Sequence, residues 1–185
     1  MRFLYSEVTK AFGHRFQIDP TAKIAWNARG QRLRKSGIPL DTKTGRGVPA
    51  EYGWRQVFSL ALAYHLLETG ITPERCAKLV SFQFGDLIAD MASDSDDLGF
   101  YVVRPAAFDE YKPKTALGRL VDFPIYKARS ELSSIPARAT VVIMVDLGQL
   151  VDQLCKAFAA TGERSETELR KGFDTWLANP GSEAT

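Results

Sequence analysis

The segment 147–158 limits the folds open to this chain more than any other, because its apolar residues recur with helical spacing. The positions i, i+3, i+4, i+7, i+8 and i+11 carry Leu147, Leu150, Val151, Leu154, Cys155 and Phe158. An amphipathic helix of this kind needs an apolar surface that covers its stripe. A later segment places Leu169, Phe173, Trp176 and Leu177 on a second apolar helix face.

Two surfaces can cover these stripes: the core of their own domain, or a second copy of the chain. The core alternative is reasonable, because a domain of some 80 residues needs most of its apolar faces for itself. We favour the second copy, because the neighbouring strands are too few to use both faces. The sequence therefore predicts a homodimer that pairs through Leu147, Leu150, Val151, Leu154, Phe158, Phe173 and Trp176.

The first half of the sequence is predicted to be mainly helical, and the second half is predicted to contain both strands and helices. Caps and spacing predict helices over 6–12, 20–35, 54–66 and 73–92. Strands are expected over 100–103, over 140–145 with both faces covered, and at a sheet edge over 123–126. Capping residues place helix starts at Asp146 and Ser165. The predicted class is α+β, with a helical domain over 1–92, a small α/β domain over 98–178 and a tail over 179–185.

Charge divides the sequence near the same place. Residues 1–80 hold 13 basic and 6 acidic residues for a net charge of +7, whereas residues 81–185 have a net charge of −5. The acidic segment 93–97 marks the expected domain junction. A basic half of this kind favours an anionic partner, although a solvated basic face is the plainer alternative.

The remaining composition excludes several classes. No apolar run approaches the ~18 residues of a membrane span, and the early charges leave no signal-peptide core. Cys76 and Cys155 lack a CxxC spacing, which is typical of reduced thiols in a cytoplasmic protein. His14 and His65 are the two histidines, and no catalytic or metal-binding motif surrounds them. We expect no catalytic residue, no metal and no cofactor, and an enzyme with its site in the second domain is the less favoured alternative.

Nucleic-acid binding has positive support in the first half. A short helix, a turn and a helix that begins at Pro20 are typical of a helix-turn-helix. The second helix presents donors that can contact bases or phosphates, and a glycine-flanked arginine follows it. The predicted DNA-binding residues are Thr21, Lys23, Asn27, Gln31, Arg32, Arg34, Lys35, Lys43, Arg46 and Tyr52.

The order of motifs also resembles a known family. Residues 6–13 (SEVTKAFG), 34–39 (RKSGIP), 44–52 (TGRGVPAEY) and 67–74 (LETGITPE) follow one another as in the winged helix-turn-helix domain of MerR-family transcription regulators. The resemblance covers about 4–80. It implies a regulator that places its second helix in the major groove and its wing on the phosphate backbone.

The sequence departs from that family in two respects. The second helix either ends at Gly30 or extends to Ser36, which leaves the base-contacting positions open. The long coiled coil through which typical members dimerise is absent after Val80, and no cysteine set for metal sensing is present. The predicted function is therefore sequence-specific binding of double-stranded DNA by a transcription regulator. An excisionase-like architectural protein that binds DNA with the same domain is the alternative.

Overall fold

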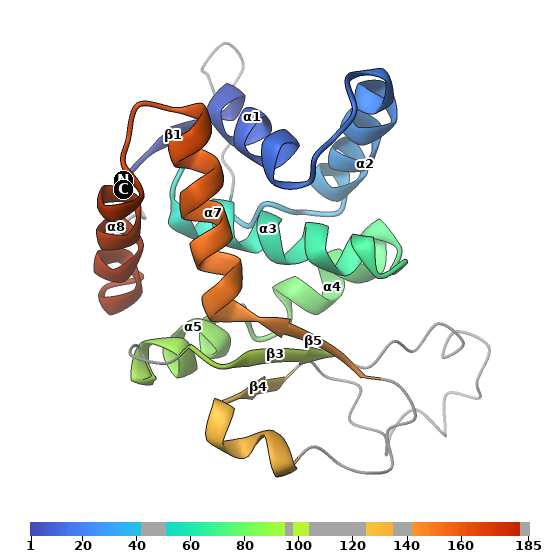
Figure 1. Ribbon diagram of the computed structural model, residues 1–185. Helices are drawn as coiled ribbons and strands as arrows, with labels where there is room; N and C mark the ends of the chain where they lie inside the picture. Colours follow the sequence, from blue (N-terminus) through green and yellow to red (C-terminus); the bar gives the residue numbers. More distant parts are fainter. Residues whose placement is uncertain (42–50, 95–97, 104–124, 135–141, 182–185) are drawn as a thin grey trace, which may run out of the picture.

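The computed structural model describes residues 1–41, 51–94, 98–103, 125–134 and 142–181, which form a mixed helical and β structure (Figure 1). The helices of the first half are α1 (Tyr5–Arg15), α2 (Lys23–Lys35), α3 (Trp54–Glu68), α4 (Pro73–Ser81) and α5 (Phe84–Ser93), with a 3-10 turn η1 (Pro20–Ala22) before α2. The second half adds a 3-10 helix η3 (Arg129–Ser134), α7 (Leu147–Thr161) and α8 (Glu166–Ala178). These elements agree with the predicted α+β class.

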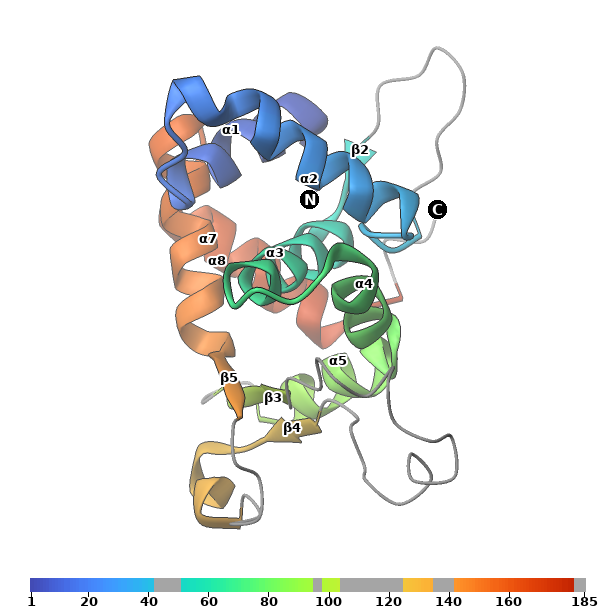
Figure 2. The same cartoon turned by 90° about the vertical axis from the view of Figure 1, so that its right-hand side faces the viewer.

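Two small antiparallel sheets complete the fold. Strand β1 (Phe3–Leu4) pairs with β2 (Glu51–Tyr52). Strands β3 (Phe100–Val103), β4 (Ile125–Lys127) and β5 (Ile143–Asp146) form a sheet in the order β4-β3-β5. This sheet lies at the opposite end of the molecule from α1 and α2, and α3 runs through the middle (Figure 2).

Local sequence signals set most helix ends. The Asp19 side chain accepts a hydrogen bond from the Thr21 backbone N–H at the start of η1, and Thr72 caps α4 in the same way. Gly37 closes α2 with φ +92°, a conformation that glycine adopts without strain. The Ile38 N–H then donates to the Leu33 carbonyl, as in a Schellman motif. The second helix of the predicted helix-turn-helix therefore continues past Gly30.

Two of the predicted elements are wrong in detail. The helix expected over 73–92 is broken, because Gln83 adopts φ +51° and turns the chain. The turn lets α4 pack against α2 and α3 while α5 packs against α8. Strand β5 begins at Ile143, because Val142 is not in a strand, and the expected positions 140 and 141 lie outside the described residues. It lies at a sheet edge, where Met144 is 41% exposed, so its two faces are not both covered.

The last two helices return to the first half of the chain. Helix α7 packs against α1 and crosses α3, and α8 packs beside α7 and α5 (Figure 1). Aromatic rings join the two halves: Phe3 lies 4.6 Å from Phe158, and Trp54 lies 5.4 Å from Phe173, between ring centroids. One apolar core extends from Phe3 to Leu177. The described residues therefore do not form a separate domain with its own core over 98–178.

The same packing corrects the predicted pairing surface. All of its residues are 4% exposed or less inside the single chain: Leu147, Leu150, Val151, Leu154, Phe158, Phe173 and Trp176. The sequence left open whether the stripes face a core or a twin, and the structure shows a core.

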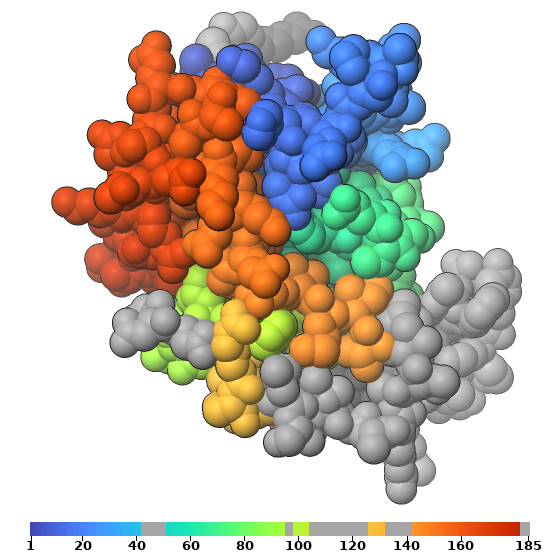
Figure 3. Space-filling model, in the orientation of Figure 1, coloured from blue at the N-terminus to red at the C-terminus, as the bar shows by residue number. Residues whose placement is uncertain are grey.

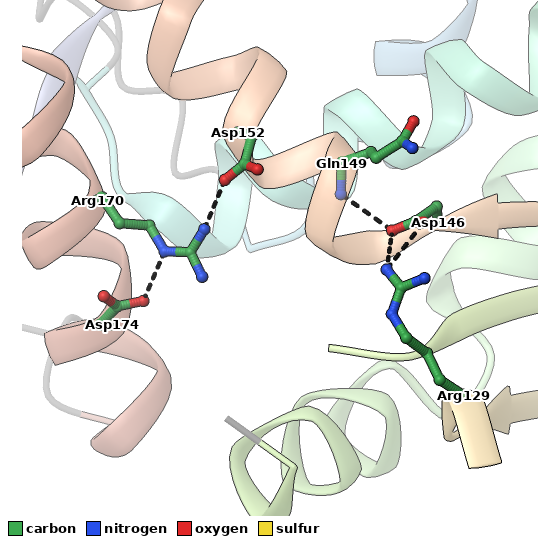
Figure 4. A network of polar contacts seen from close by, with 6 residues as sticks. All are labelled: Arg129, Asp146, Gln149, Asp152, Arg170 and Asp174. Carbon is green, nitrogen blue, oxygen red and sulfur yellow. Dashed lines mark hydrogen bonds and ion pairs between the residues drawn. The ribbon is translucent and has the colours of Figure 1, made fainter. Parts of the chain in front are cut away.

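Polar contacts fix the ends and flanks of α7. Asp146 accepts a hydrogen bond from the Gln149 N–H at 3.0 Å and pairs with Arg129 at 2.8 Å, so the predicted cap is present (Figure 4). On α8, Arg170 donates to Asp152 of α7 at 2.6 Å and to Asp174 at 3.1 Å. The described part of the chain contains no helix with the length and apolar character that a membrane crossing requires.

Candidate nucleic-acid interface

Helix α2 is attached to the molecule by a narrow seam. The seam consists of Trp26, Gly30 and Leu33, which lie on one side of the helix. Trp26 stacks on Tyr64 of α3, with ring centroids 4.4 Å apart and planes at 19°. Of the thirteen residues of α2, Leu33 alone is buried. Most of the helix surface therefore faces solvent.

The solvent-facing surface of α2 is basic. The helix contains five basic residues and no acidic one: Lys23, Arg29, Arg32, Arg34 and Lys35. All five are exposed, and none pairs with a carboxylate in the described part of the chain. In the space-filling view, α1 and α2 form one corner of the molecule (Figure 3). Such a protruding helix without acidic residues matches the requirements of phosphate contact.

One of these cations has a defined position. The Arg34 guanidinium lies 4.9 Å from the centre of the Tyr5 ring, which is a cation–π contact. Burial raises the pKa of Tyr52, while Arg34 opposes that shift. Tyr5 is half exposed and begins α1. Sequence analysis missed it, since no local pattern connects the first residue of one helix to the end of the next.

The structure places the predicted DNA-binding residues in three groups. Six of them are exposed on α2: Lys23, Asn27, Gln31, Arg32, Arg34 and Lys35. Thr21 is exposed in η1, where its hydroxyl donates to Asp19 at 2.5 Å. Tyr52 is only 2% exposed, so its prediction as a surface contact is wrong, and its ring lies 6.1 Å from that of Tyr5. Lys43 and Arg46 lie outside the described residues.

Beneath α2, an aromatic cluster ties it to α1 and α3. The Phe16 ring lies 5.4 Å from Trp26 and 5.6 Å from Tyr64. A cavity of about 30 Å³ remains beside the cluster, lined among others by Tyr5, Asn27 and Arg34. This volume holds one or two water molecules. The helix packing therefore leaves no room here for an effector molecule.

A partly buried polar network lies beside the cluster, where the His65 ring contacts Phe16. His65 Nδ1 lies 3.2 Å from the Ala61 carbonyl oxygen, and Nε2 lies 3.1 Å from Nη2 of Arg15. The same Arg15 nitrogen donates to Gln153 of α7. This set fits a neutral ring with its proton on Nδ1. Burial lowers the pKa of His65, and the Arg15 charge lowers it further.

The two cysteines, Cys76 and Cys155, are both free and buried. Burial raises the pKa of Cys76 to about 12 and that of Cys155 to about 11, so both thiols stay protonated at neutral pH. Over the described residues, no cluster of three or more His, Cys, Asp and Glu side chains is placed to hold a metal ion. In comparisons with protein-family models, curated proteins and solved structures, nothing matches the chain.

Proposed function

We propose that this chain is a sequence-specific transcription regulator that binds double-stranded DNA with α2 in the major groove. One observation supports it above all: α2 projects five cations and no carboxylate, while only its Trp26–Leu33 seam is used for packing. A helix that existed only to complete the core would bury a wider stripe. Phosphates are the partners that such an unpaired basic helix fits.

The dimensions of α2 agree with this role. Its thirteen residues span about 20 Å, and the major groove admits an α-helix. Asn27 and Gln31, which can bond to base edges, lie on the exposed side between flanking cations. The resemblance of 4–80 to the winged helix-turn-helix of MerR-family regulators adds to the argument. We extend the proposal to Lys43 and Arg46, as phosphate contacts of a wing between α2 and β2.

The decisive experiment selects bound duplexes from a pool of genomic fragments and measures how their affinity depends on salt. We expect the wild-type chain to retain a few promoter fragments. Replacing Arg32 and Lys35 together by alanine should lower the slope of log K against log salt by about 2, because each lost phosphate contact contributes about 0.9. Replacing the exposed Lys156 and Lys171 of α7 and α8 changes the net charge equally and serves as the control.

Each alternative has its own outcome in this experiment. Retention of one attachment region instead of promoters would indicate the architectural role. Equal losses in the two double variants would show that binding depends on net charge and not on α2. If no duplex is retained at low salt, the proposed function is wrong. The homodimer that the sequence predicts is tested alongside, by light scattering of the chain with and without its selected duplex.

A further inference from the structure

Ile24 is the most exposed large apolar side chain that the structure describes. It is 84% exposed, whereas none of the other exposed large apolar residues exceeds 48%. It lies in the first turn of α2, beside Lys23. A β-branched residue is a weak helix former, and at this exposure it gains little from burial. Neither helix propensity nor packing therefore accounts for an isoleucine at this position.

The seam fixes the direction in which Ile24 points. Residues two apart in an α-helix differ by about 200° around the axis, so they face nearly opposite sides. Because Trp26 stacks on Tyr64, Ile24 is directed away from the body of the molecule. The stacking therefore holds the isoleucine on the outer face of the helix.

The neighbours of Ile24 form a surface of mixed character. Asn27, Ala28 and Gln31 follow at i+3, i+4 and i+7, so the four side chains share the outer face. Two amides thus alternate with two apolar groups, and Lys23, Arg32 and Lys35 border them. The major groove offers the matching set: acceptors and donors on adenine, the apolar 5-methyl group of thymine, and phosphates on both sides.

We propose that Ile24, with Ala28 beside it, contacts the thymine methyl group of an A·T pair in the DNA that α2 binds. The inference rests on the proposed function and adds a base preference to it. Thymine is the base of unmodified DNA that carries a methyl group in this groove. A protein partner fits the surface less well, because one isoleucine among five cations offers little apolar area. Contact between Ile24 and thymine is thus a source of specificity separate from the amide contacts.

The test replaces thymine by deoxyuridine, one position at a time, in the duplex selected above. Deoxyuridine keeps the base pairing and removes only the methyl group. The wild-type chain should bind about fourfold more weakly at one or two positions, the effect of losing one buried methyl group. Ile24→Ala should bind the thymine and the uracil duplexes equally at those positions. Because Ile24 is exposed, thermal unfolding should show that the variant stays folded.

A matched control comes from β5. Met144 is also an exposed apolar residue, at 41%, and Met144→Ala should keep the fourfold preference for thymine. If the wild-type chain binds its duplex but no position distinguishes it from Ile24→Ala, the thymine contact is wrong and the DNA-binding proposal stands. If Ile24→Ala instead weakens all sequences equally, Ile24 does not contact a base. A failure to select any duplex counts against the proposed function itself.

Discussion

The guanidinium of Arg34 is held by a cation–π contact with the Tyr5 ring, at 4.9 Å from the ring centre. The buried Tyr52 ring lies 6.1 Å from the Tyr5 ring, between ring centroids, and so packs beside the ring that Arg34 contacts. At the exposed end of α2, such support matters because an arginine loses rotamer entropy when it binds a phosphate. A side chain already held in place loses less.

We therefore predict that Tyr5→Ala weakens DNA binding by about two- to fivefold, the value of an exposed cation–π contact. Tyr5→Phe keeps the ring and should bind like the wild type. Fluorescence anisotropy with a labelled duplex measures both variants. Equal losses in the two variants would show that the Tyr5 hydroxyl, and not its ring, carries the effect.

His65 gives the stability of the protein a pH dependence of known sign. Its pKa is lowered in the folded state, mainly by burial, so the unfolded chain binds a proton more readily. Protonation would also bring a second positive charge against Arg15, an effect that the negative charge of Glu68 opposes. The free energy of unfolding should therefore decrease as the pH falls below about 6.5, the ordinary histidine value.

Urea unfolding at pH 7.5 and 5.5 measures this dependence. His65→Gln should reduce the difference in unfolding free energy between the two pH values. His14 is exposed on α1, so His14→Gln should leave the difference unchanged. The interpretation is wrong if the two variants have the same effect.

At the scale of elements, the docking of α2 depends on a close approach at Gly30. A Cβ atom built at this position would lie 2.7 Å from the Tyr64 hydroxyl oxygen but 4.0 Å from the ring carbon that carries it. The hydroxyl thus requires glycine here, although glycine is a poor residue for a helix interior. Glycine at this position lowers the helix propensity of α2 but allows α2 and α3 to come into contact.

A double-mutant cycle tests this requirement. Gly30→Ala alone should destabilise the protein or displace α2, because the methyl group meets the Tyr64 hydroxyl. In a Tyr64→Phe background the same change should stabilise it by about 0.5–1 kcal/mol, the helix-propensity gain of alanine over glycine. Denaturant unfolding of the four proteins gives the coupling energy. Additive effects would mean that α2 adjusts freely at Gly30.

Element ends were largely predictable from sequence, because a cap is encoded within a few residues. Asp19, Thr72 and Ser165 each start a helix or turn as expected, and Gly37 ends α2. The break at Gln83 was not predictable, since glutamine carries no turn signal and its positive φ results from packing of α4 and α5 against different partners. The exposed polar residues of α2 were also predictable, because their helical spacing is encoded within the segment itself.

At the scale of the whole molecule, the sequence predicted which helix faces are apolar but not which other elements cover them. A stripe shows that a helix must be covered, but nothing in residues 147–158 shows that α1 and α3 cover it. Charge reversal near 93–97 suggested a domain boundary, yet surface charge carries no information about which apolar faces meet. The positions of Tyr5 and Tyr52 were not predicted correctly either, because they depend on contacts between residues that are distant in the sequence.

Because the α7 stripe belongs to the core, a change within it should affect folding and not pairing. Leu154 is 1% exposed, and Leu154→Ala should lower the free energy of unfolding by about 2–5 kcal/mol. Lys156 is exposed on the same helix, and Lys156→Ala should change it by less than about 0.5 kcal/mol. Denaturant unfolding measures both. A folded Leu154→Ala variant of wild-type stability but altered mass in light scattering would favour the pairing surface after all.

The return of α7 and α8 to α1 and α3 also constrains how the protein is made. A ribosome releases α3 long before Phe158, and at about 5–20 residues per second this interval lasts roughly 5 to 20 s. Throughout it, Phe3 and Trp54 lack the aromatic rings that cover them in the finished molecule. The nascent chain therefore offers apolar surface to chaperones and proteases until its last helices emerge. Translation products that stop before residue 147 should be degraded, because they lack both helices that cover this surface.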